Sequence, residues 1–96
     1  MRGLLSFKIL WFLSQKPMYG QEIAKGIEGM IGGKPSPGTL YPALKRMEQE
    51  GWIRVQKKNK EKIYTITESG KKSLRTSMEM FYRSYKCMFE VETKKR

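Results

Sequence analysis

The feature that most restricts the fold is a pair of short apolar segments that enclose a polar, lysine-rich stretch. Residues 52–55 alternate apolar and basic side chains, and residues 63–66 form a second run rich in β-branched and aromatic side chains. The seven residues between them are polar and include four lysines. This pattern predicts a β-hairpin with a charged loop over residues 56–62.

Helical periodicity and chain breakers divide the preceding residues into three short helices. Residues 2–14 are apolar around most of the helix circumference, which predicts burial on more than one side. Residues 19–31 have apolar positions three and four apart, although Gly26 and Gly29 weaken a helix. The two glycines indicate either the close approach of a neighbouring element or a less stable helix.

The third helix has a clear start and a clear end. Ser36-Pro37 offers a hydroxyl to cap free N–H groups and a proline preset for the first helical position, and Gly51 closes the helix. Pro42 leaves two alternatives. The helix starts at Ser36 and bends at Pro42, or it starts at Thr39 and holds Pro42 in its first turn. The longer, bent helix is favoured.

Thr67 is expected to cap a final helix over residues 68–93, which would extend on the order of 39 Å. The predicted fold is mainly α with a small β-hairpin, a winged helix-turn-helix followed by one long C-terminal dimerisation helix. Residues 1–66 would form the DNA-binding domain, residues 67–93 the dimerisation helix, and residues 94–96 a frayed basic tail.

Composition limits the classes of function. Histidine and aspartate are absent, and Cys87 is the one cysteine, so imidazole bases, zinc clusters and an internal disulfide are not expected. No nucleophile or phosphate-loop motif occurs, and we therefore expect no enzyme, no cofactor and no metal. No apolar run reaches the length of a membrane span and no signal peptide is recognised, so a cytoplasmic location is expected.

The formal charge of +11 points instead to a polyanionic partner. Residues 52–66 hold five basic residues and one acidic residue, the highest density in the chain. A helix-turn-helix formed by the second and third helices would place the third in the DNA major groove. The first turns of that helix offer Ser36, Gly38, Thr39, Tyr41 and Lys45 to DNA. The hairpin offers Lys57, Lys58, Lys60 and Lys62 to phosphates.

Each of these residues also has a plainer interpretation. Ser36 can be only a helix cap, Tyr41 a half-buried aromatic, and the lysines a means of keeping a turn soluble. Three functions remain open on this evidence. They are a sequence-specific DNA-binding regulator, a winged-helix module that docks an acidic protein, and a protein that coats nucleic acid without sequence preference.

Four segments carry a more specific pattern. They are Pro17-Met18-Tyr19-Gly20-Gln21-Glu22-Ile23, Ser36-Pro37-Gly38-Thr39-Leu40-Tyr41-Pro42-Ala43-Leu44-Lys45-Arg46-Met47-Glu48, Gly51-Trp52-Ile53 and Tyr64-Thr65-Ile66-Thr67-Glu68-Ser69-Gly70. In order and spacing they resemble the PadR family of transcription regulators over residues 3 to about 72. The resemblance implies a homodimeric repressor, often released by a small molecule. It also implies that Tyr19, Ser36, Thr39 and Tyr41 line the DNA face, and it supports the longer helix through Pro42. The wing departs from the family, because Lys-Asn-Lys-Glu-Lys replaces a Gly-Arg-Pro-like segment.

The last helix has a heptad pattern that predicts pairing with a second copy. Two-fold symmetry would then require a pseudo-palindromic operator with half-sites roughly 34 Å apart. The expected dimerisation residues are Leu4, Leu5, Trp11, Leu74, Met78, Phe81, Tyr82, Tyr85, Met88 and Phe89. A small aromatic effector could enter between Trp11, Phe12, Met78, Phe81 and Tyr85, although such residues more often form plain core. Nothing in the sequence around Cys87 marks it as an activated thiol.

Overall fold

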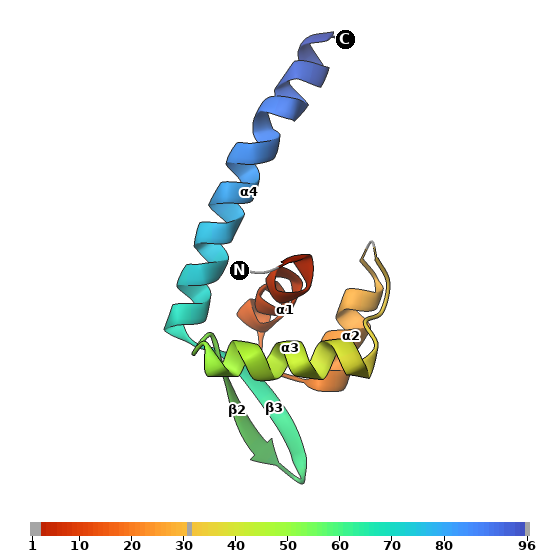
Figure 1. Cartoon of the computed structure of the whole chain (residues 1–96), viewed down its shortest axis with the longest axis vertical. Coiled ribbons are helices and arrows are strands. Elements are labelled where there is room, and N and C mark those ends of the chain that lie inside the picture. Colours follow the sequence, from red (N-terminus) through yellow and green to blue (C-terminus); the bar gives the residue numbers. More distant parts are fainter. Residues whose placement is uncertain (1–2, 31, 96) are drawn as a thin grey trace.

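The computed structural model describes residues 3–30 and 32–95 and has the predicted order of helices and hairpin, with one additional strand (Figure 1). The elements are α1 (Gly3–Gln15), β1 (Met18–Tyr19), α2 (Gly20–Glu28), α3 (Pro37–Gln49), β2 (Ile53–Lys58), β3 (Glu61–Ile66) and α4 (Glu68–Lys95). In Figure 1, α3 lies across the base of the helices, the hairpin projects below it, and α4 rises away on the other side. The predicted winged-helix fold is confirmed.

The additional strand β1 joins the hairpin to form a three-stranded antiparallel sheet in the order β1-β3-β2. Met18 pairs with Tyr64 and Tyr19 with Ile63. The prediction of a helix from residue 19 to residue 31 was therefore too long at both ends. Tyr19 is extended in β1, and α2 stops at Glu28, directly before Gly29. Ile31, the last residue of the predicted helix, lies outside the described residues.

A single apolar core joins α1, α2, α3 and the sheet, and it also receives the first turns of α4. Its fully buried side chains come from all three short helices. They are Ile9, Leu10, Ile23, Ile27, Leu40, Leu44 and Met47. Gly26 supports this packing, because a β-carbon there would lie 2.7 Å from the ring of Phe12. One of the two expectations for this glycine, the close approach of a neighbouring element, is thus confirmed.

The third helix runs unbroken from Pro37 to Gln49 with Pro42 inside it, so the longer alternative is correct. Ser36 occupies the N-cap position in an extended conformation, but its hydroxyl caps no backbone N–H group. That part of the prediction was wrong, because the Ser36 hydroxyl donates to Thr39 Oγ1 at 3.1 Å instead. Gly51 has a φ of 80°, the left-handed conformation expected after the helix.

The hairpin loop is much shorter than the seven residues predicted. The strands continue to Lys58 and Glu61, and only Asn59 and Lys60 form the turn, with φ of 53° and 67°. Two successive positive φ angles are typical of a type I′ turn, whose twist matches that of the strands. Lys57, Lys58 and Lys62 are therefore strand residues with a fixed register rather than members of a flexible loop.

The long helix α4 is anchored at its start by Thr67. The backbone N–H of Gly70 donates to Thr67 Oγ1 at 3.0 Å, as the predicted cap requires, and the Thr67 hydroxyl donates to the Gly51 carbonyl. The helix extends to Lys95, two residues beyond the predicted end, and Arg96 lies outside the described residues. Among the helices described here, none combines the length and apolar character needed to cross a membrane.

Candidate nucleic-acid interface

The first turn of α3 is open to solvent. Ser36, Gly38 and Thr39 are all exposed, and the hydroxyls of Ser36 and Thr39 bond to one another. None of these three residues lines the hollow between α2 and the hairpin or the hollow between α3 and the hairpin. They therefore form a separate, accessible part of the predicted DNA surface, at the end of α3 nearest α2 (Figure 1).

Tyr41, one turn further along α3, is 44% exposed and leans against the start of α2. A β-carbon on Gly20 would lie 2.9 Å from both Cε1 and the hydroxyl oxygen of the Tyr41 ring. The lack of a side chain at Gly20 is what allows this ring position. Gly20 is a site residue that the sequence did not single out, although it adjoins Tyr19 in one of the family-like segments.

Beyond Tyr41, a groove of about 630 Å³ separates α3 from the hairpin. This α3–hairpin groove brings together four of the predicted residues, Tyr41, Lys45, Lys57 and Lys62. Glu48 and Tyr64 also line it. Burial raises the pKa of the Tyr64 hydroxyl above its usual 10.0, and Tyr41 and Glu48 raise it further, so this phenol stays protonated near neutral pH.

Two of the groove lysines face each other directly across the hairpin. The register pairs Lys57 with Lys62 on the same face of the two strands. Like charges placed opposite one another destabilise a hairpin, and no ion pair within the described residues offsets either ammonium group. The two lysines therefore place positive charge close together in the groove. An anion bound between the strands and α3 would reduce the repulsion between them.

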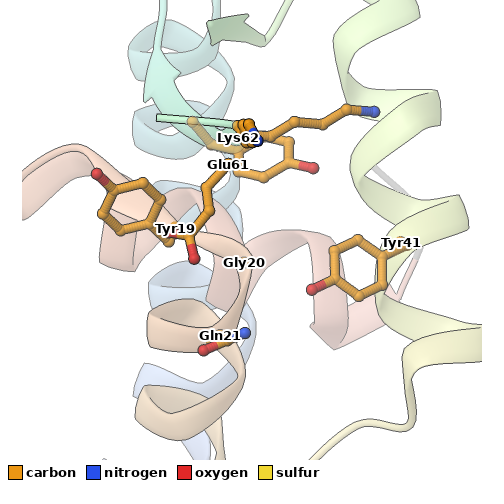
Figure 2. A pocket seen from close by; sticks show the side chains of 8 residues that line it. Tyr19, Gly20, Gln21, Tyr41, Glu61 and Lys62 are labelled. Carbon is orange, nitrogen blue, oxygen red and sulfur yellow. The ribbon is translucent and has the colours of Figure 1, made fainter. Parts of the chain in front are cut away.

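A second hollow lies on the other side of Tyr41, between the start of α2 and the hairpin. This α2–hairpin cleft has a volume of about 300 Å³ and is shown in Figure 2. Tyr19 and Tyr41 stand on opposite sides of Gly20 there, and Lys62 extends above them. The full lining is Tyr19, Gly20, Gln21, Tyr41, Lys60, Glu61, Lys62 and Tyr64.

Lys58 is the predicted hairpin lysine that lines neither hollow. It is exposed on β2, directly opposite Glu61 in the register. Gln21, Glu61 and Tyr64 line the cleft without having been predicted. Tyr64 was recognised only as a strand residue, because its place beside Tyr41 depends on pairing between segments distant in the sequence.

Most residues predicted for dimerisation form an exposed apolar surface on α1 and α4. Leu4, Trp11, Met78, Phe81, Tyr82, Tyr85, Met88 and Phe89 are exposed, and Met80, which the heptad did not include, is exposed as well. Leu74 corrects the prediction, because it is only 6% exposed and packs into the core of its own chain. Leu5 is also half-buried against that core.

The five residues predicted to line an effector pocket do not surround one hollow. A groove of about 390 Å³ between α1 and α4 is lined by Phe81 and Tyr85 together with Leu4, Phe7, Ser77, Met80 and Ser84. Trp11, Phe12 and Met78 are not among them. Phe12 instead turns inward onto Gly26. The expected effector pocket belongs to an interface between two copies and stays a prediction.

Comparison with known proteins identifies the family. Residues 9–76 match the Transcriptional regulator PadR-like family. The chain belongs to that family. It is 32% identical over 80 residues to the Transcriptional regulator YqjI of Escherichia coli, a match that covers 80% of this chain and 39% of YqjI. It is 37% identical over 49 residues to the Transcriptional activator GvpE1 of Halobacterium salinarum, which covers 51% of this chain and 26% of GvpE1.

The chain thus spans between about a quarter and two fifths of the length of these two relatives. A solved structure agrees with it over nearly the whole chain. The PadR family transcription regulator from Clostridium difficile R20291 superposes with a TM-score of 0.75 at 30% identity, covering 96% of this chain and 97% of that one. The segments that resembled the PadR family in the sequence lie within this shared fold.

Proposed function

We propose that this PadR-like chain is a transcription regulator that binds double-stranded DNA in a sequence-specific manner as a homodimer. The observation that carries the proposal is the α3–hairpin groove. There Lys45, Lys57 and Lys62 surround a hollow next to the exposed Tyr41. Lysine ammonium groups suit phosphate, whereas the side chains at the start of a recognition helix suit base edges. The two kinds of contact would lie side by side on one surface.

The exposed apolar residues of α1 and α4 support the homodimer. Among the α1 and α4 side chains that the structure describes, nine large apolar ones are exposed, more than a small soluble domain usually leaves in contact with water. A second copy carries the same exposed apolar surface, so a two-fold axis along α4 would bury both surfaces against each other. It would also repeat the recognition surface, and we expect a pseudo-palindromic operator with half-sites roughly 34 Å apart.

Repression is the simplest consequence of such binding, because a dimer seated on a promoter excludes other proteins from it. The name of GvpE1 describes an activator, and the position of the operator relative to the promoter would decide between the two outcomes. The aromatic lining of the groove between α1 and α4, which includes Phe7, Phe81 and Tyr85, supports a small aromatic molecule as the releasing effector.

The test is selection of bound fragments from the source genome, followed by affinity measurement at two salt concentrations. We expect recovered fragments to contain an inverted repeat and to bind more tightly than scrambled duplexes of the same composition. A protein that binds all duplexes equally is a non-specific coating protein. One that binds an acidic protein but no duplex is a protein-interaction module. Either result contradicts the proposal.

A further inference from the structure

The hydroxyl of Tyr64 stands at the end of a buried side chain and has no hydrogen-bond partner within the described residues. Tyr64 as a whole is 5% exposed. No described side-chain polar atom that is shut off from solvent lacks a partner, so this hydroxyl is open to solvent and free to donate to a ligand. Tyr64 lines both the α2–hairpin cleft and the α3–hairpin groove, where a bound ligand can reach it.

The remainder of the α2–hairpin cleft suits an anion. The N–H groups of Gly20 and Gln21 begin α2 and have no preceding helical turn to bond to, and a helix N-terminus attracts negative charge. Lys60 and Lys62 line the cleft from the hairpin side. Figure 2 shows Lys62 there. Since the pKa of Tyr64 is raised by burial, its hydroxyl keeps the proton that it would donate.

Glu61 is the one carboxylate in the cleft lining and opposes an anion. Lys58, directly across the hairpin, offsets part of its charge. Lys60 and Lys62 outnumber it in the lining itself, so the cleft keeps an excess of positive charge. The two hollows share Tyr41, Lys62 and Tyr64, which makes the cleft a continuation of the groove past Tyr41.

We propose that the α2–hairpin cleft is a phosphodiester subsite in which one backbone phosphate of the bound DNA accepts a hydrogen bond from the Tyr64 hydroxyl. This inference rests on the proposed function, because the phosphate belongs to the DNA strand that crosses the α3–hairpin groove. It assigns a ligand-binding role to Tyr64 and to the start of α2. Gly20 serves this subsite by allowing the Tyr41 ring to border it.

The test uses Tyr64→Phe in the full chain, which removes only the hydroxyl. The probes are a duplex of about 30 base pairs recovered in the genomic selection and a scrambled duplex of equal length. A hydrogen bond to a charged group is worth about tenfold in affinity, and a phosphate carries no sequence information. We expect about a tenfold loss for each cleft engaged, equal on both duplexes, with an unchanged melting temperature. Thr76→Val, which removes a hydroxyl from the exposed part of α4, is the control and should change nothing.

The possible outcomes separate the two proposals. If the unaltered protein binds neither duplex, the proposed function fails and the subsite fails with it. If the unaltered protein binds and Tyr64→Phe binds equally well, the subsite alone is overturned. A loss confined to the recovered fragment would mean that the hydroxyl contacts a base, which also overturns the phosphate assignment.

A second variant covers the case in which Tyr64→Phe destabilises the fold. Glu61→Gln removes the opposing charge from the exposed end of β3 without touching the core. We expect it to bind both duplexes about two- to fivefold more tightly, as removal of a like charge near a phosphate predicts. Unchanged or weaker binding by Glu61→Gln contradicts an anion in this cleft.

Discussion

The ring of Tyr41 lies so close to Gly20 that a β-carbon on the glycine would come within 2.9 Å of its Cε1 atom and its hydroxyl oxygen. The contact joins the start of α2 to the first half of α3, and Tyr41 lines both the α2–hairpin cleft and the α3–hairpin groove. A change at Gly20 should therefore act on DNA through the position of Tyr41.

We predict that Gly20→Ala weakens DNA binding about tenfold but leaves the fold intact. The added methyl group displaces the end of a half-exposed side chain, which moves easily, and alanine favours a helix more than glycine does by roughly 1 kcal/mol. Duplex affinity and thermal melting measure the two effects. In a double-mutant cycle, Tyr41→Ala should remove most of the Gly20→Ala effect. Additive losses would mean that Gly20 acts independently of Tyr41.

The facing lysines of the hairpin give a second prediction. Lys57→Ala and Lys62→Ala should each weaken binding to all duplexes. Each should reduce the slope of log affinity against log salt by about 0.9 for every phosphate contact removed, which is about 1.8 for a homodimer that carries the substitution in both copies. Each variant should also stabilise the hairpin within the protein slightly, because it removes the repulsion between two paired lysines. Titrations at several salt concentrations measure the slope.

Lys58→Ala is the matched control for the hairpin lysines. Lys58 lines neither hollow and lies opposite Glu61, so its removal should change the salt slope less than the removal of Lys57 does. Equal slopes for the Lys57 and Lys58 variants would mean that the hairpin acts as diffuse charge and that the α3–hairpin groove is not the contact surface.

The turn at Asn59 and Lys60 predicts that a glycine at position 60 raises the stability of the fold but weakens DNA binding. Lys60 has a φ of 67°, a conformation that disfavours residues with a β-carbon and suits glycine. Lys60→Gly should raise the free energy of unfolding by about 1 kcal/mol, a shift of roughly 4–8 °C in melting temperature for a domain of this size. It should also weaken duplex binding, because Lys60 lines the α2–hairpin cleft. A variant that gains both stability and affinity would exclude Lys60 from the interface.

Gly26, within α2, and Gly29, directly after it, allow the effect of packing on stability to be compared with the effect of helix propensity. Gly26→Ala would place its β-carbon 2.7 Å from the Phe12 ring, whereas Gly29→Ala would meet nothing nearer than a carbonyl oxygen at 3.6 Å. Overpacking costs about 1–3 kcal/mol and exceeds the roughly 1 kcal/mol gained from propensity. Urea unfolding should therefore show that Gly26→Ala destabilises the protein and Gly29→Ala does not. Equal effects would show that Phe12 yields without cost.

Local signals were sufficient to predict most of the fold. The cap at Thr67, the left-handed glycine at position 51 and the polar stretch between two β-prone runs placed the elements in the correct order. The strand β1 was missed because two residues, Met18 and Tyr19, are too few to show an alternation. The tight turn was missed because Asn59-Lys60 lacks the glycine that usually marks a type I′ turn.

The interface was less predictable, because it depends on which segments meet in three dimensions. Tyr41 and the hairpin lysines were found from residue type and motif. The unpaired hydroxyl of Tyr64 and the contact between Gly20 and Tyr41 follow only from the pairing of β1 with β3 and the packing of α2 against α3. Leu74 shows the same limit. Its heptad position is equivalent to that of Phe81, yet it lies beside the core and is buried there, whereas Phe81 lies further along α4 and stays half-exposed.

The exposed part of α4 provides the test of the homodimer. Met88 is 59% exposed, and a second copy is expected to bury it. Met88→Glu would then bury two unpaired carboxylates across a two-fold interface, which should raise the dimer dissociation constant by about 100-fold or more. Thr76→Glu adds the same charge to α4 about 180° around the helix from Tyr85 and should leave the dimer intact. Sedimentation velocity over a range of concentrations measures both variants. If Met88→Glu stays dimeric while Thr76→Glu dissociates, the copies meet through the opposite face of α4, and the spacing expected for the operator half-sites no longer follows.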